Sequence, residues 1–126
     1  MAAEVGPETA TRLAAAMVVQ SATVYERVKP LLPAMRGHDA DFLATLTERL
    51  SFDVDRLAAP FARPALFVLG RQDSVVGYRA AFSLADAYPR ATIAVLDRAG
   101  HGLPWEQDGL FRALAGEWLG RVEEVS

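Results

Sequence analysis

Two short apolar runs mark the C-terminal half of the sequence. The first spans residues 65–69 and is stopped by Gly70, and the second spans residues 92–96, which are apolar after Thr92. Unbroken apolar runs of this length are typical of strands that are covered on both faces, as in a parallel sheet. We therefore predict two parallel strands at these positions.

The segments that follow these runs repeat apolar residues at helical spacing. A helix is expected over residues 77–88, between the two strands, and another over residues 104–122, after the second strand. Pro89 ends the first of them, because proline cannot continue a helix. The predicted order is β-α-β-α, which requires a crossover connection that is right-handed in nearly all proteins.

The N-terminal part shows only the helical repeat. A helix is predicted over residues 7–29, because Pro7 suits a first turn and Pro30 disfavours helical geometry at the residue before it. A shorter helix over residues 39–50 follows, with Asp39 as its cap. The chain of this α/β protein therefore divides into a cap-like helical segment at 1–50, a connector at 51–63 and an α/β part at 64–126.

A sheet of two strands leaves both of its outer edges unpaired. Most α/β sheets have more strands, and two strands alone are marginally stable in water. Free strand edges also attract strands from other chains. The pattern therefore favours a homo-oligomer that pairs open strand edges, or a further segment that completes the sheet.

Composition narrows the class of protein. The chain has 126 residues, of which 52% are hydrophobic, enough for one domain with a packed core. Its net charge of −3 and lack of a basic run argue against a nucleic-acid partner, and the lack of cysteine excludes disulfides and thiolate chemistry. The longest apolar run near the N-terminus, residues 13–19, is far shorter than the roughly 20 residues of a membrane span. There is no basic n-region, so we expect a cytoplasmic protein without a membrane partner.

Candidate chemistry lies in the loops that follow the two predicted strands. Asp73 follows the first strand and His101 the second, and neighbouring parallel strands would bring both loops to one edge of the sheet. A carboxylate beside a histidine fixes the ring tautomer and leaves the other ring nitrogen free to take a proton. Asp97 is a second candidate acid, and Ser74 is a candidate nucleophile that lacks a sharp elbow. The alternative is that Asp73 caps a turn and His101 is exposed in a glycine-rich loop.

The two loops and the closing helix together resemble the C-terminal part of the α/β-hydrolase fold. The similarity lies in residues 69–73, in residues 95–101 and in the helix that contains Trp118, and it extends over about residues 15–122. The resemblance implies that Asp73 is the triad acid and His101 the triad histidine. It also implies that the N-terminal helices are part of the cap.

The resemblance does not extend to a nucleophile. Members of the family carry it in a G-x-S-x-G elbow upstream of these loops. The serines here stand at positions 21, 51, 74, 83 and 126, and none is flanked in this way. The resemblance therefore implies a hydrolase portion that is inactive alone and takes a small-molecule substrate only when an N-terminal half completes it. We expect a truncated gene product, a mis-called start or one half of a split enzyme.

Several further interpretations stay open. Apolar residues of the cap-like segment would line an acyl pocket, or would simply pack between helices: Met17, Tyr25, Leu31, Leu32 and Met35. The chain would otherwise be a non-catalytic interaction module that dimerises or binds a separate N-terminal half. A metal site built from Asp73, His101 and His38 is the third possibility, although its spacing is loose. The interpretation we adopt includes neither a metal nor a cofactor.

Overall fold

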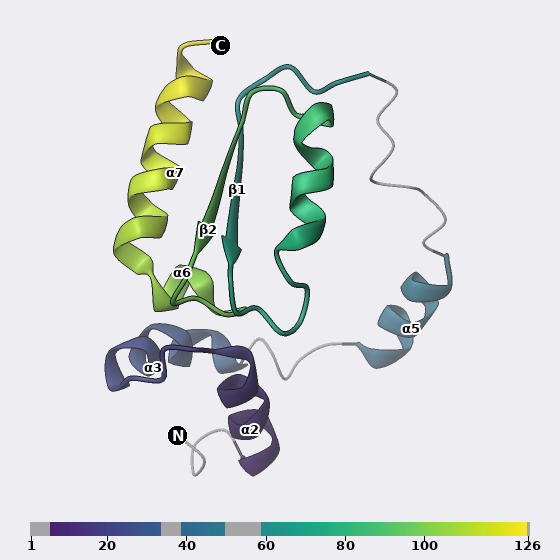
Figure 1. Ribbon diagram of the computed structural model, residues 1–126. Helices are drawn as coiled ribbons and strands as arrows, with labels where there is room; N and C mark the ends of the chain where they lie inside the picture. The colour runs from purple at the N-terminus through teal and green to yellow at the C-terminus, as the bar shows by residue number, and fades with distance from the viewer. Residues whose placement is uncertain (1–5, 34–38, 50–58, 126) are drawn as a thin grey trace.

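The computed structural model describes residues 6–33, 39–49 and 59–125 (Figure 1). No helix within these ranges is long and apolar enough to cross a membrane. In chain order the elements are α2 (Pro7–Ala16), α3 (Ala22–Val28), η1 (Lys29–Leu31), α5 (Ala40–Arg49), β1 (Ala65–Gly70), η2 (Arg79–Ala87), β2 (Ala91–Leu96), α6 (Leu103–Glu106) and α7 (Asp108–Glu123).

The two strands form a parallel sheet, as the apolar runs predict. Their register runs from Ala65 beside Ala91 to Gly70 beside Leu96. The ladder continues beyond its last pair, where the Arg71 N–H donates to the Leu96 carbonyl at 2.9 Å. The structure thus confirms the α/β class, and it places the carboxyl ends of both strands at the same edge of the sheet.

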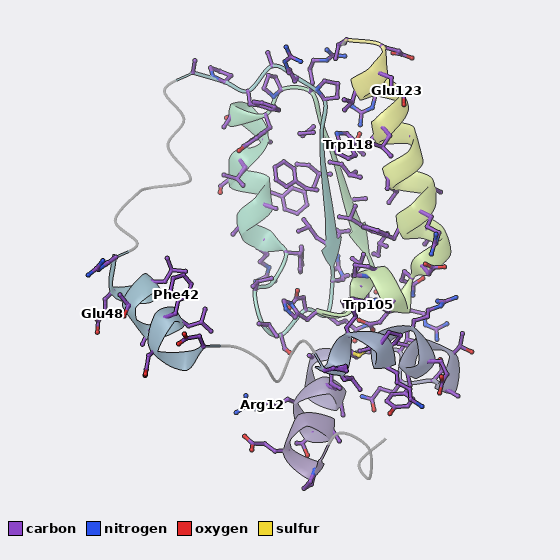
Figure 2. The ribbon with its side chains drawn as sticks, turned by 180° about the vertical axis from the view of Figure 1, so that it is seen from behind. Arg12, Phe42, Glu48, Trp105, Trp118 and Glu123 are labelled. Carbon is purple, nitrogen blue, oxygen red and sulfur yellow. The ribbon has the colours of Figure 1, made fainter. Side chains whose placement is uncertain are left out.

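Helices cover both faces of this sheet, which explains why the strands carry apolar residues on both sides. On one face Phe67 packs edge-on against Tyr88, the residue after η2, with ring centroids 5.2 Å apart. On the other face lies α7, where Trp118 Nε1 donates to the Pro64 carbonyl at 3.0 Å and Arg121 donates to Thr92 Oγ1 at 2.7 Å. Figure 2 shows Trp118 between α7 and the strands.

The N-terminal helix is interrupted, and the prediction of one helix over residues 7–29 is wrong. The chain leaves helical geometry at Met17, and α3 begins after Ser21, whose hydroxyl accepts from the Val24 N–H at 3.2 Å. Gln20 stabilises the break, because its side-chain amide donates to the carbonyls of Ala14 and Met17. These polar contacts replace the helical hydrogen bonds that the break removes.

The later helices also differ from their predicted spans. The crossover is a 3₁₀ helix, in which the Tyr88 N–H reaches the Ala85 carbonyl three residues back at 3.2 Å. The closing helix is divided at Gln107, whose side chain donates to the Arg98 carbonyl at 2.6 Å. The break lets α6 turn toward the loop that follows β2, whereas α7 runs along the sheet.

The N-terminal helices lie across the carboxyl ends of the strands (Figure 1). A small core holds them together, in which Ala10, Val28 and Leu32 are buried and Trp105 of α6 packs against them. Helix α5 stands apart in the same view, and its apolar side chains, such as Phe42, remain exposed.

At Gly70, the last residue of β1, the chain lies close to the backbone of the loop after β2. A Cβ atom there would lie 2.4 Å from the Gly100 carbonyl oxygen and 2.6 Å from that of Ala99. Directly beyond it, the Gln72 N–H donates to the Ala99 carbonyl at 3.0 Å. Only glycine permits this backbone contact, because both obstructing atoms belong to the main chain.

Replacing Gly70 by alanine is predicted to destabilise the fold by about 1–3 kcal/mol, the usual cost of overpacking a rigid site. Urea denaturation measures the change. Gly116→Ala is the matched control, because a Cβ at Gly116 meets nothing within 4 Å and alanine suits the interior of α7 better than glycine. Equal stability of the two variants would contradict the close approach.

Candidate acid–base site

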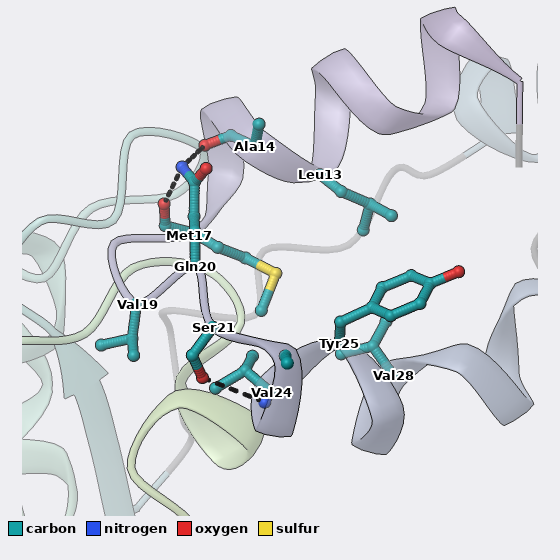
Figure 3. Close-up of a pocket in the computed structure, with 10 residues that line it drawn as sticks. Leu13, Ala14, Met17, Val19, Gln20, Ser21, Val24, Tyr25 and Val28 are labelled. Atoms are coloured by element: carbon teal, nitrogen blue, oxygen red, sulfur yellow. Dashed lines mark hydrogen bonds between the residues drawn. The ribbon is translucent and has the colours of Figure 1, made fainter. Parts of the chain in front are cut away.

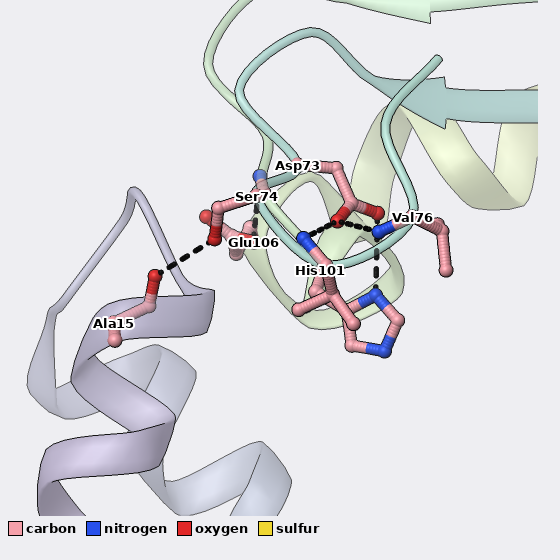
Figure 4. Close-up of polar contacts among 8 residues, drawn as sticks. Ala15, Asp73, Ser74, Val76, His101 and Glu106 are labelled. Carbon is pink, nitrogen blue, oxygen red and sulfur yellow. Dashed lines mark hydrogen bonds and ion pairs between the residues drawn. The ribbon is translucent and has the colours of Figure 1, made fainter.

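Asp73 and His101 meet where the loops after β1 and β2 lie side by side (Figure 4). The distance between Asp73 Oδ2 and His101 Nδ1 is 3.2 Å. A carboxylate can only accept a hydrogen bond, so Nδ1 of the ring carries the hydrogen. The prediction that Asp73 and His101 lie close together is therefore confirmed. Their proximity results from the parallel pairing of β1 and β2.

The surroundings of Asp73 favour its ionised form. Burial alone would raise the pKa of this carboxyl, since only 8% of the side chain is exposed. Hydrogen bonds from the backbone N–H groups of Val76 and Val75 to Oδ1, at 3.1 and 2.8 Å, outweigh burial, and His101 adds to their effect. The net result is a pKa below the ordinary value of 3.8, so Asp73 is an anion at neutral pH.

The other nitrogen of the His101 ring is available for chemistry. Nε2 is turned away from Asp73 (Figure 4), and within the described residues it has no hydrogen-bond partner. The side chain is 49% exposed. The backbone is fixed, because the His101 N–H donates to the Ala16 carbonyl at 2.7 Å. A histidine held in this way presents one free basic nitrogen in a defined direction.

An apolar cavity of about 780 Å³ borders the ring. Arg12 and Ser74 lie at its wall with His101, but most of its lining is apolar: Leu13, Ala15, Ala16, Met17, Val28, Leu31, Val75, Gly102, Pro104 and Trp105. The cavity therefore suits an apolar group placed beside Nε2. It lies between the N-terminal helices and the two loops.

The residues expected to line an acyl pocket are only partly found there. Met17 and Leu31 do line the cavity beside His101. Tyr25 lines a separate pocket of about 310 Å³ between α2 and α3 (Figure 3), and Leu32 is buried in the helical core. Met35 lies outside the described residues. The sequence also did not single out Trp105 of α6, which lines the cavity.

Among the described residues, neither competing candidate is hydrogen-bonded to the His101 ring. Ser74 lines the cavity, but its hydroxyl donates to the Ala15 carbonyl at 3.3 Å. Asp97 offers its backbone carbonyl to Gln72, at 2.9 Å. In the described part of the chain, Asp73 is the acid bonded to the His101 ring.

The metal alternative finds no support in the described ranges. They hold no group of three or more His, Cys, Asp or Glu side chains placed to bind one ion. His38, the third ligand of that alternative, lies outside them. Asp73 and His101 by themselves form a pair rather than a coordination sphere.

Glu106 is the important residue that the sequence did not reveal. The residue is 7% exposed, and its carboxylate accepts three backbone hydrogen bonds. Oε1 binds the Gly100 N–H at 2.9 Å, and Oε2 binds the N–H groups of Val18 and Val19 at 2.7 and 2.8 Å. One buried charge thus joins the His101 loop to the break between α2 and α3.

Nothing in the local pattern distinguishes Glu106. Glu106 lies in the first turn of α6. Acidic residues are common in a first turn, because the positive end of the helix dipole stabilises their negative charge. Its partners Val18 and Val19 are 88 and 87 residues away in the chain. Only the three-dimensional structure shows that this carboxylate faces inward.

Glu106→Gln is predicted to lower the free energy of unfolding by about 1.5–3 kcal/mol. The glutamine amide carries no charge, and its NH₂ group would face backbone N–H groups, which are hydrogen-bond donors as well. Urea denaturation measures the loss. Glu117→Gln is the control, since Glu117 is 54% exposed in its ion pair with Arg121 and is expected to cost less than about 1 kcal/mol. Equal losses in both variants would contradict the clamping role of Glu106.

The stability that Asp73 contributes should depend on pH. The folded chain lowers its pKa below 3.8, so the contribution is fully present above that value and is lost as the pH falls through the lower, folded-state pKa. Asp73→Asn should therefore be less stable than wild type at neutral pH, by about 1.5–3 kcal/mol, with the difference shrinking below 3.8.

Urea denaturation at a series of pH values tests this dependence. The exposed Asp86 of η2 supplies the control substitution, Asp86→Asn. A stability difference between wild type and Asp73→Asn that is the same at every pH would show that the folded state does not favour the Asp73 carboxylate.

Comparison with known proteins does not assign a function to this site. No protein-family model matches the chain, and neither the curated proteins nor the solved structures contain a significant match. The function of the site is therefore inferred from its own residues.

Proposed function

We propose that Asp73 and His101 are the acid–base half of a hydrolytic site of the α/β-hydrolase type. The observation that carries the proposal is the 3.2 Å contact between Asp73 Oδ2 and His101 Nδ1, made by a histidine that lines an apolar cavity. The order of the two residues after consecutive parallel strands agrees with that fold. The cavity suits a small-molecule substrate with an apolar group.

In this proposal the two residues have distinct roles. Nε2 of His101 removes a proton from a nucleophile and later returns it to the leaving group. Asp73 stays ionised throughout, holds the ring in one tautomer and stabilises the imidazolium that forms. The lowered pKa of Asp73 is consistent with this role, because a protonated carboxyl would not stabilise a cation.

The nucleophile in this proposal comes from polypeptide outside the 126 residues. Each described serine already bonds to the backbone: Ser21 accepts from the Val24 N–H, Ser74 donates to Ala15, and Ser83 donates to Ala80. Neither Ser51 nor Ser126 has the flanking glycines of a G-x-S-x-G elbow. The chain alone is accordingly expected to be inactive in acyl transfer.

A second candidate function is a non-catalytic interaction module. It is favoured by the two-stranded sheet, whose outer edges are unpaired within the described residues, and by the exposed apolar side chains of α5. In that case the Asp73–His101 contact would only stabilise the loops.

The chain alone should not turn over p-nitrophenyl butyrate, an ester with a small apolar acyl group. Wild type and His101→Ala are expected to release nitrophenolate at the same background rate, because Nε2 has no hydroxyl to activate. Turnover by the wild type that disappears in His101→Ala would place the nucleophile inside the chain or in bound water and would contradict the proposal.

The coding DNA upstream of Met1 provides the complementary test. The proposal expects an in-frame G-x-S-x-G, and the longer product should hydrolyse the same ester. In that product His101→Ala should lower kcat by about a million-fold and Asp73→Asn by about 10,000-fold, whereas Ser83→Ala should not change it. Hydrolysis that is indifferent to both substitutions would contradict the roles of His101 and Asp73, and an upstream stop codon without the motif would favour the interaction module.

A further inference from the structure

The apolar cavity beside His101 has a permanent positive charge at its wall. Among the described residues that line it are the Arg12 guanidinium and the His101 ring, but no aspartate or glutamate side chain. Arg12 projects from α2 (Figure 2), and a guanidinium stays protonated at every pH at which a protein is folded. The described lining therefore favours a ligand with a negative charge over one with a positive charge.

Helix α2 sets the position of Arg12 relative to His101. The Ala16 carbonyl accepts the His101 N–H at 2.7 Å, and the Ala15 carbonyl accepts the Ser74 hydroxyl at 3.3 Å. Arg12 comes four residues before Ala16, so it shares that face of α2 about 6 Å further along the helix axis. The imidazole and the guanidinium thus lie one helical turn apart along the same wall.

The guanidinium of Arg12 can accept a ligand without breaking a strong contact. It has five N–H donors, and the partner found among the described residues is Glu8, whose Oε1 accepts from Nη2 at 2.8 Å. Both side chains of this ion pair are 80% exposed, and exposed pairs contribute little to stability. A ligand carboxylate can therefore use the other donors of Arg12 or replace Glu8.

The rest of the lining defines the remainder of the ligand. Apart from Arg12, Ser74 and His101, the described lining consists of apolar side chains and Gly102. Met17 is among them, and the flexible methionine side chain adapts to the shape of an apolar ligand. A short methylene chain matches these surfaces. A ligand that suits the whole cavity carries a carboxylate at one end of such a chain and a group for His101 at the other.

We propose that the cavity takes half-esters of aliphatic dicarboxylic acids, with the free carboxylate on Arg12 and the ester group beside Nε2 of His101. Hydrolysis of such an ester consumes one water and releases an alcohol and the dicarboxylic acid. Arg12 is then the residue that determines specificity for the charged end. The reaction rests on the proposed hydrolytic function, whereas the binding preference follows from the cavity and is measurable without turnover.

An NMR titration of the isotope-labelled 126-residue chain tests the preference, because binding requires no nucleophile. Monomethyl adipate, an anion at neutral pH, should bind about fivefold more tightly than the neutral dimethyl adipate. The difference should shrink in about 1 M NaCl, which screens charges. The indole N–H signal of Trp105, which lines the cavity, should shift, whereas that of Trp118, bonded to the Pro64 carbonyl, should not.

Three substitutions make the test specific to Arg12. Arg12→Gln should remove the preference for the half-ester, and Glu8→Gln should increase it, because the guanidinium then has no competing carboxylate. Arg112→Gln is the matched control and should leave the preference unchanged. Arg112 forms the same kind of ion pair four residues apart, with Asp108 at 2.8 Å, and is 77% exposed, but it does not line this cavity.

Several outcomes would overturn the inference. Equal affinity for the two esters, or no binding of either at millimolar concentration, would show that the cavity does not select this charge. A preference that Arg12→Gln retains would overturn the role of Arg12, because another group would then bind the anion. If the preference is found but the longer product hydrolyses no ester, the binding site is confirmed and the hydrolytic function is wrong.

Discussion

The buried carboxylate of Glu106 joins parts of the chain that are distant in sequence. It accepts hydrogen bonds from the backbone of Gly100, Val18 and Val19. Placing a charge in the interior is costly unless hydrogen bonds compensate, and here three charge-assisted bonds do so. The partners are the loop that holds His101 and the break between α2 and α3. Both walls of the apolar cavity are therefore fixed to one side chain.

The parallel sheet supplies the other half of the site. It brings the loops after β1 and β2 to one edge, and Gly70 lets them touch, because no Cβ separates its backbone from Ala99 and Gly100. Asp73 then reaches His101 from the neighbouring loop. The sheet thus sets the position of the acid–base pair, whereas Glu106 sets the helices that enclose the space beside it.

The sequence was sufficient for features that depend on local pattern or on strand order. Apolar runs identified β1 and β2, and their order placed Asp73 beside His101. The break after Ala16, the division at Gln107 and the role of Glu106 were not predictable in this way. Each depends on hydrogen bonds between segments that are distant in the chain or in separate elements, such as Val18 with Glu106. A helical repeat looks the same whether or not such a bond interrupts it, so the expected helix over residues 7–29 was too long.

Parallel pairing and the Glu106 clamp together hold an ionised carboxylate against the His101 ring. A crystal structure of the 126-residue chain tests it most directly, through the distance between Asp73 Oδ2 and His101 Nδ1. We expect a distance of 3.2 Å between these two atoms, and a Glu106 carboxylate that accepts from the Gly100 N–H. Antiparallel strands, or an ordered backbone that keeps the two side chains beyond hydrogen-bonding distance, would contradict it.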